Sequence, residues 1–201
     1  YADWLPIKRT LKCDAKPVTY KSEALAEKLG LKNLYITFNG YFPEIGAKMR
    51  NCSFKETEAY SICARLGVDK KDEVIVVSSA GNTARAFAQV CSDNNIKLLL
   101  TIPEDNLDAL WFEKPLNPCV KVIATKSGSD YFDAINLGNI ACEVEGFFAE
   151  GGAKNIARRD GMATTMLSAT TFIGRIPDYY FQAVGSGTGA IAAWEANLRF
   201  I

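Results

Sequence analysis

The chain has 201 residues, of which 48% are hydrophobic and 23% are charged, as is typical of an ordinary globular protein. Its 23 Lys and Arg residues balance its 23 Asp and Glu residues, so the sequence predicts no basic surface for nucleic acid or an anionic membrane. A small neutral or zwitterionic ligand fits this charge balance better. The chain has no histidine, which excludes Ser-His-Asp and Cys-His catalysis and removes the commonest metal ligand.

The sequence lacks the marks of membrane insertion and of secretion. No apolar run reaches the roughly 18 residues that a membrane helix needs, and the N-terminal stretch YADWLPIKRT has no signal-peptide core. The six cysteines are scattered without a C-x-x-C pair, which is typical of a reducing compartment and indicates no metal site. We therefore expect a cytoplasmic protein. The chain begins with Tyr1 rather than Met and its last helical pattern has no C-cap, so we expect it to be part of a longer protein.

Apolar runs of strand length alternate with segments of helical spacing along the chain. The strands are expected at 34–38, 74–79, 96–102, 120–125, 146–150 and 179–184. The helices are expected at 22–30, 54–67, 82–94, 129–142, 160–172 and 191–200. Several of the apolar runs are continuous, which suits strands that are covered on both faces. The predicted fold class is therefore α/β, with mostly parallel sheets and helices on both faces. Residues 68–150 are predicted to form a small α/β domain, and 1–67 and 151–201 to be parts of a larger domain.

The stretch VVSSAGNTARAFA (76–88) places a polar turn between a strand and a helix. Its hydroxyl groups, its amide and its free backbone N–H groups lie at the positive end of the helix, where a carboxylate or phosphate oxygen binds well. The simpler alternative is that Ser79 or Asn82 only caps the helix while Gly81 forms the turn.

The stretch NCSFKETEAYS (51–61) places Lys55 near the start of a helix, beside Phe54. A helix lysine is usually a solvated surface charge. Here the apolar and small neighbours and the helix N-terminus disfavour the ammonium form, which lowers the pKa of the amine. Such a lysine can form a Schiff base and then act as a base. Because the chain has no histidine, Lys55 is the leading candidate for the catalytic base.

The stretch AVGSGTGA (183–190) follows an apolar run, precedes a helical pattern and fits G-x-G-x-x-G/A, the dinucleotide-binding fingerprint. That reading requires an acidic residue about 20 positions later for the ribose, and the chain ends before that position. A site for a single phosphate would use the same turn. A tight glycine turn without a ligand is the remaining alternative.

In this order and spacing, Ser53-Phe54-Lys55, SSAGNT (78–83) and GSGTG (185–189) resemble the motifs of the fold-type II pyridoxal-phosphate enzymes, which have the tryptophan synthase β-like fold. Within that group the chain resembles the threonine synthase-like enzymes, and nearly the whole of the stretch 150–199 resembles the cysteate synthases. The resemblance implies two lobes, with the C-terminal part of the large domain and the partner of the pyridine nitrogen beyond Ile201. Cys52 departs from the pattern, because relatives commonly have glycine there.

The resemblance also implies roles for individual residues. Lys55 would hold pyridoxal 5′-phosphate as a Schiff base and act as the catalytic base, and Asn82 would bond the ring hydroxyl. The cofactor phosphate would be held by Gly185, Ser186, Gly187, Thr188 and Gly189. The substrate carboxylate would be bound by Ser78, Ser79 and Thr83. Since arginine suits phosphate and sulfonate oxygens, Arg158 and Arg159 are further candidates for substrate binding.

The implied reaction is the replacement of the phosphate of O-phospho-L-serine by sulfite, which gives L-cysteate for coenzyme M biosynthesis. A homo-oligomer is expected. The first alternative is a threonine synthase that acts on O-phosphohomoserine. An alternative of another class is a binding module without catalytic activity, either of the pyridoxal-phosphate fold or specific for a nucleotide.

Overall fold

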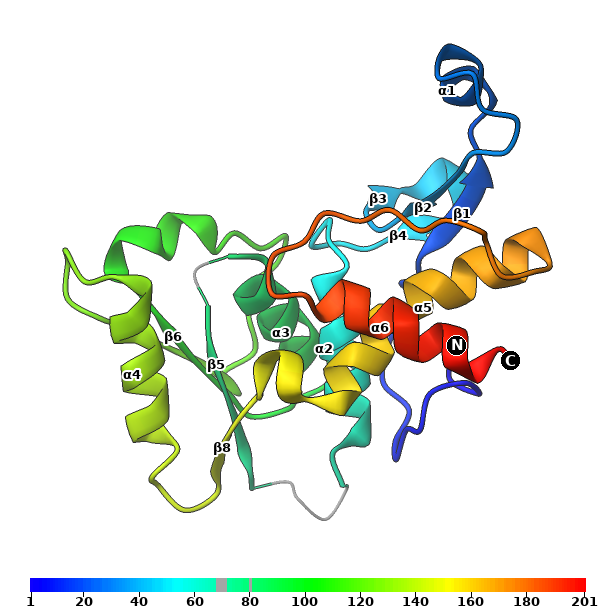
Figure 1. Cartoon of the computed structure of the whole chain (residues 1–201). Helices are drawn as coiled ribbons and strands as arrows, with labels where there is room; N and C mark the ends of the chain where they lie inside the picture. The colour runs from blue at the N-terminus through cyan, green and yellow to red at the C-terminus, as the bar shows by residue number, and fades with distance from the viewer. Residues whose placement is uncertain (68–71, 80) are drawn as a thin grey trace.

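The computed structural model describes residues 1–67, 72–79 and 81–201, and Figure 1 shows its elements. The strands are β1 (Val18–Lys21), β2 (Tyr35–Phe38), β3 (Tyr41–Phe42), β4 (Ala47–Lys48), β5 (Val74–Ser78), β6 (Leu98–Ile102), β7 (Val120–Ala124) and β8 (Phe147–Ala149). The α-helices are α1 (Glu23–Lys28), α2 (Lys55–Arg65), α3 (Asn82–Asp93), α4 (Tyr131–Ala141), α5 (Ile156–Ile173) and α6 (Thr188–Arg199). Short 3-10 helices are η1 (Pro43–Ile45), η2 (Glu104–Ala109) and η3 (Gly152–Lys154).

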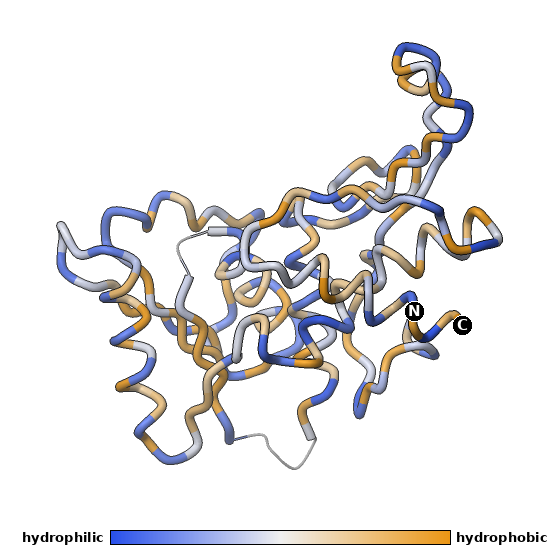
Figure 2. The backbone as a smooth tube through the Cα atoms, viewed as in Figure 1, coloured by the Kyte–Doolittle hydropathy of each residue, from blue (hydrophilic) through white to orange (hydrophobic). Residues whose placement is uncertain are grey.

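The central feature is a parallel four-stranded sheet in the order β7-β6-β5-β8. Helices α2 and α3 lie on one side of it and α4 on the other (Figure 1). The side chains of β5 alternate accordingly: Ile75 and Val77 belong to the core with α2 and α3, whereas Ser78 faces Gly138 of α4. Strand β6 is buried at all five positions because both of its faces are covered, which explains its continuous apolar sequence. Figure 2 shows the same apolar character in these central strands.

The remaining elements surround α5, the longest helix. It packs against α2 on one side and α6 on another, and it also contacts the antiparallel pair β1–β2. Gly161 permits the close crossing of α5 over α2, because a Cβ atom at this position would lie only 2.3 Å from the carbonyl oxygen of Thr57. The crossing fixes the side chains of α2 relative to those of α5.

The sequence-based α/β fold class is confirmed, and the strands expected at 34–38, 74–79, 96–102, 120–125 and 146–150 all form. The strand expected at 179–184 does not form. This segment runs along the outside of α6 in Figure 1, and Phe181 is 89% exposed. An apolar run becomes a strand only beside a neighbouring strand that takes its backbone hydrogen bonds, and none of the described residues pairs with it. The proposed domain division stays a prediction. The core of the parallel sheet also includes Ile62 of α2 and Ala157 of α5, which lie on the other side of the expected boundaries.

None of the helices in the described parts of the chain is both long and apolar enough to span a membrane.

Candidate active site

Lys55 is the first residue of α2, and its side chain reaches Glu58, three residues later on the same helix. Its Nζ donates to both carboxylate oxygens of Glu58, at 3.1 Å each, and lies 4.6 Å from the centre of the Phe54 ring. The Lys55 side chain is only 19% exposed. Burial lowers the pKa of this amine below its ordinary value, against the opposing effect of Glu58. The result is a lysine whose neutral, nucleophilic form is more accessible than that of a surface lysine.

Glu58 belongs to a buried charge network made of Lys55, Glu58, Glu150 and Arg158. The Arg158 Nε donates to Glu58 at 2.7 Å, and its Nη1 donates to Glu150 at 2.6 Å. Glu58 is fully buried, while Glu150 and Arg158 are each 8% exposed. Burial alone would lower the pKa of Arg158, but the two carboxylates raise it. The network thus contains two cations and two anions, so the charges are balanced without solvent.

Asn51 joins the loop before Lys55 to the SSAGNT turn. It is 2% exposed, its Oδ1 accepts from the Ser53 backbone N–H at 3.0 Å, and its Nδ2 donates to the Asn82 carbonyl at 3.4 Å. A second link runs from Arg158, whose Nη2 lies 3.5 Å from the Thr83 hydroxyl. Two of the sequence motifs are therefore held together by side-chain hydrogen bonds.

The backbone of the lysine loop bears on the departure from the family pattern at Cys52. Cys52 has a φ of 58°, in the left-handed region that glycine adopts without strain. The glycine that the family resemblance implies at this position would therefore suit the same turn. In this chain the loop tolerates a cysteine because Asn51 and Ser53 on either side of it are bonded in place.

Glu56, the residue after Lys55, is fully buried. Burial raises its pKa to about 7, against the lowering effects of the Asn51 backbone N–H and of Arg50. Its Oε2 accepts from that N–H at 3.0 Å. Glu56 therefore holds the backbone of the loop that leads to Lys55.

The glycine turn forms the N-terminal end of α6. Gly187 is the N-cap with a left-handed φ of 81°, and the hydroxyls of Ser186 and Thr188 lie 2.8 Å apart. Phe54 packs against the apolar cluster that includes Ala192 of α6. The third motif thus approaches the lysine end of α2.

Two of the predicted substrate-binding residues have other partners. The Ser78 hydroxyl lies 2.7 Å from that of Thr101, on the face of the sheet covered by α4. Arg159 donates to Glu195 of α6 and to the Ala153 and Lys154 carbonyls. The structure therefore does not bring Ser78 or Arg159 to the charge network, whereas Arg158 is part of it.

Sequence reasoning missed Glu58, Glu150, Asn51 and Glu56. Glu58 could have been found, because residues three apart on a helix face each other and Lys55 and Glu58 have that spacing. Glu150 could not, because it reaches Arg158 only through the fold, from the end of β8.

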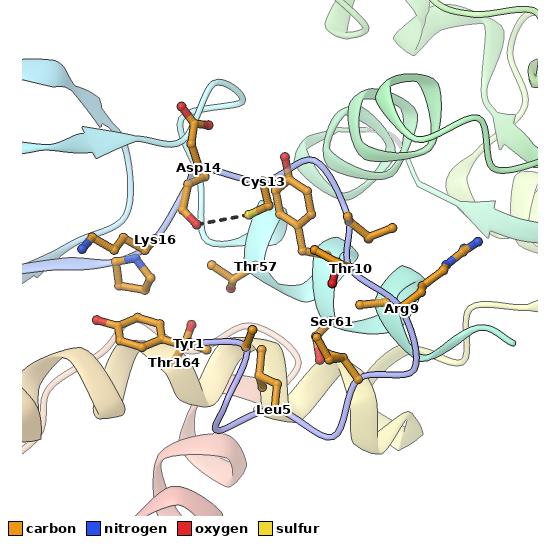
Figure 3. A pocket seen from close by; sticks show the side chains of 17 residues that line it. Tyr1, Leu5, Arg9, Thr10, Cys13, Asp14, Lys16, Thr57, Ser61 and Thr164 are labelled. Carbon is orange, nitrogen blue, oxygen red and sulfur yellow. Dashed lines mark hydrogen bonds between the residues drawn. The ribbon is translucent and has the colours of Figure 1, made fainter. Parts of the chain in front are cut away.

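A separate cavity of about 280 Å³ lies on another face of α2, beneath the N-terminal segment (Figure 3). Thr57 and Ser61 of α2 and Thr164 of α5 line it, and near its edge the Cys13 thiol lies 3.4 Å from the Ala15 carbonyl. Lys55 and Asn82 do not line this cavity, so it is distinct from the site where the motifs meet.

The amino-acid sequence is similar to those of curated cysteate synthases. Cysteate synthase of Methanosarcina acetivorans is 48% identical over 99% of the chain, and that of Methanoculleus marisnigri is 51% identical over all of it. The chain covers 48% and 46% of these two proteins, so it spans about half the length of the curated relatives it matches.

Solved structures share the fold at low sequence identity. Cysteine synthase from Entamoeba histolytica superposes with a TM-score of 0.70 at 16% identity, covering 98% of this chain and 59% of that one. Threonine deaminase isoform 2 from Solanum lycopersicum gives 0.71 at 19% identity, covering 94% of this chain and 48% of that one. The family described as pyridoxal-phosphate dependent enzyme matches residues 19–199. The chain therefore belongs to the pyridoxal-phosphate dependent enzyme family.

Proposed function

We propose that the full-length protein is a pyridoxal-phosphate dependent enzyme that converts O-phospho-L-serine and sulfite into L-cysteate and phosphate. The proposal is supported by 48 to 51% identity to cysteate synthases along the whole chain. The observation that carries it is the position of Lys55, a desolvated amine at the start of α2 that side-chain hydrogen bonds connect to the SSAGNT turn. A surface lysine would have neither property.

The residues present fit the cofactor. Lys55 offers a poorly solvated amine for the cofactor aldehyde, and Asn82 is held by Asn51 in the adjacent turn. At Gly185 and Gly187 a Cβ atom would meet no atom within 4 Å, so there is open space in front of the helix end. Backbone N–H groups at the positive end of a helix are suited to a phosphate. We assign the phosphate to the residues from Gly185 to Gly189: Gly185, Ser186, Gly187, Thr188 and Gly189.

The cofactor, when bound, supplies an electron sink for the substrate Cα. Lys55 Nζ takes the Cα proton, which requires the amine in its neutral form. Glu58 stabilises the ammonium that this transfer creates, because both of its oxygens face Nζ. Arg158 keeps Glu58 in place through its 2.7 Å bond to Oε2, an oxygen that Lys55 Nζ also contacts. In the overall reaction the Cβ–O bond to phosphate breaks and a Cβ–S bond to sulfite forms.

For the substrate carboxylate, the contacts favour Ser79 and Thr83 over Ser78. Ser79, directly after β5, is 8% exposed, and among the described residues its hydroxyl accepts a single long bond of 3.4 Å, from Gly81; Thr83 lies within reach of Arg158. The Ser78 hydroxyl is engaged by Thr101 behind the sheet. A cytoplasmic location and a homo-oligomeric state remain expectations of the proposal.

Phosphate release from the purified full-length protein tests the proposal. We expect release from O-phospho-L-serine only when sulfite is present, with formation of L-cysteate. O-phosphohomoserine with water is the control pair for the threonine synthase reaction, and the Lys55→Ala protein is the control for catalysis. Release from O-phosphohomoserine but not from O-phospho-L-serine would contradict the proposal.

A further inference from the structure

Arg85, in the first turns of α3, is a buried arginine without a carboxylate partner. It is 7% exposed, and it differs from Arg158, which pairs with two carboxylates. No ion pair joins Arg85 to an acidic side chain of the described residues, and the titratable group that acts on its charge is the Cys52 thiol. Burial lowers the pKa of Arg85, yet a guanidinium remains charged in proteins. A buried cation of this kind is destabilised until an anion approaches it.

The neighbours of Arg85 hold the guanidinium without satisfying it. Its Cζ lies 3.4 Å from the centre of the Trp111 ring, so the ring covers one face. Its Nε lies 3.4 Å from the Trp111 carbonyl and its Nη1 3.3 Å from the Asn82 Oδ1, both long contacts to uncharged oxygens. Stacking on a ring leaves the N–H groups at the edge of the guanidinium available, and this planar edge matches the oxygens of an oxyanion.

The position of Arg85 connects it to the proposed active site. Asn82, which accepts from its Nη1, is bonded through its carbonyl to Asn51 in the lysine loop. Arg85 also lies close enough to Cys52, three residues before Lys55, for the two groups to interact electrostatically. The charge of Arg158, by contrast, is already balanced by Glu58 and Glu150. Of these two buried arginines, Arg85 is the one with charge to offer to an anion.

We propose that Arg85 binds an oxyanion of the reaction, either sulfite or the phosphate group of the substrate. This inference rests on the proposed function, because that reaction brings one oxyanion in and releases another. Trp111 orients the guanidinium, and Asn82 fixes the distance between the oxyanion and the cofactor side of the turn.

Sulfate is the probe for binding, because it carries oxyanion oxygens but lacks the nucleophilic sulfur of sulfite. Isothermal titration calorimetry of the cofactor-loaded full-length protein should show a sulfate dissociation constant at least roughly tenfold higher in Arg85→Gln than in the wild type. Arg85→Lys, which keeps the charge but loses the planar fork, should fall between them. Arg175→Gln is the matched control, since Arg175 is exposed and pairs with Asp178, and it should bind sulfate as the wild type does.

Steady-state kinetics show whether Arg85 binds sulfite or the phosphate group of O-phospho-L-serine. A raised KM for sulfite alone in Arg85→Gln assigns the site to sulfite, and a raised KM for O-phospho-L-serine alone assigns it to the substrate phosphate. Unchanged sulfate affinity would overturn the inference. If cofactor binding weakened while sulfate affinity stayed the same, Arg85 would only position Asn82, which also overturns it. A wild-type protein that releases no phosphate would refute the proposed function, while sulfate binding that depends on Arg85 would still establish the anion site.

Discussion

Both carboxylate oxygens of Glu58 lie 3.1 Å from Nζ of Lys55, one turn earlier on the same helix. The contact occurs in a site where Glu58 is fully buried and its Oε2 also accepts from Arg158. Glu58 therefore acts on Lys55 in two ways. It stabilises the ammonium form, and it fixes the direction in which the amine points.

Replacing Glu58 by Gln should lower the pKa of Lys55 further. Burial already depresses this pKa and the Glu58 charge opposes that effect, so removing the charge leaves desolvation and Arg158 to act together. A close opposite charge is worth roughly 1 to 3 pH units. The measurement is an NMR titration of the isotopically methylated amine in the cofactor-free protein, with exposed Glu27→Gln as the control. An unchanged or higher pKa in Glu58→Gln would show that Glu58 does not act on Lys55.

Glu56 should make the folded protein less stable as the pH rises. Its pKa is about 7 in the folded protein against an ordinary 4.5, so between these values the folded state holds a proton that the unfolded state releases. At about 1.4 kcal/mol per pH unit, this group reduces the free energy of unfolding by about 3 kcal/mol between pH 4.5 and 7. Urea unfolding of Glu56→Gln at pH 5 and pH 8 should lack this decrease, whereas Glu27→Gln should retain it. Parallel pH profiles for wild type and Glu56→Gln would contradict the assignment.

Gly161→Ala should destabilise the protein despite the helix preference of alanine. The added Cβ would lie 2.3 Å from the Thr57 carbonyl oxygen and 2.9 Å from the Glu58 Cα, both backbone atoms that cannot move alone. Overpacking of this kind costs about 1 to 3 kcal/mol, which exceeds the gain of up to about 1 kcal/mol from helix propensity. Thermal unfolding of the cofactor-free protein measures the change. Gly185→Ala, where the Cβ meets no atom within 4 Å, should unfold like the wild type.

Asn51→Ala should weaken cofactor binding without changing the chemistry at Lys55. The substitution removes the hydrogen bonds that join the lysine loop to Asn82 and order Ser53. Two lost hydrogen bonds correspond to about 1 to 3 kcal/mol, or roughly a 5- to 150-fold higher dissociation constant for pyridoxal phosphate. Titration followed by the visible absorbance of the bound cofactor measures it, with exposed Asn106→Ala as the control. Equal affinities in the two variants would rule out a role for Asn51 in joining the motifs.

The sequence predicts the parallel sheet well because its strands are short apolar runs bounded by turns, such as VIVVS and LLLTI. Residues 179–184 are also a short apolar run, but they form no strand. A strand needs a neighbouring strand that takes its backbone hydrogen bonds, and an apolar run in the sequence does not show whether that neighbour is there. Lys55 could be singled out from its local setting. That Arg158 pairs with Glu58 and Glu150 could not be predicted, because Glu58 lies 100 residues earlier on α2, which α5 crosses, and Glu150 approaches from the end of β8.

In the site, too, features that adjacent residues determine could be predicted, whereas contacts between distant segments could not. The turn at Gly187 is encoded by adjacent residues and forms as a helix N-terminus. Which of two neighbouring arginines enters the charge network depends on helix rotation, and the structure selects Arg158 while Arg159 turns to Glu195. A basic pair in a sequence therefore predicts a charge near the site but not which residue supplies it.

The most direct test of the account is borohydride reduction of the cofactor-loaded full-length protein, followed by peptide mass spectrometry. Reduction fixes the cofactor covalently to the amine that holds it. We predict a phosphopyridoxyl group on Lys55, still present in Lys97→Ala and absent in Lys55→Ala. A cofactor group on another lysine, or none in the wild type, would contradict the central claim that Lys55 binds pyridoxal phosphate.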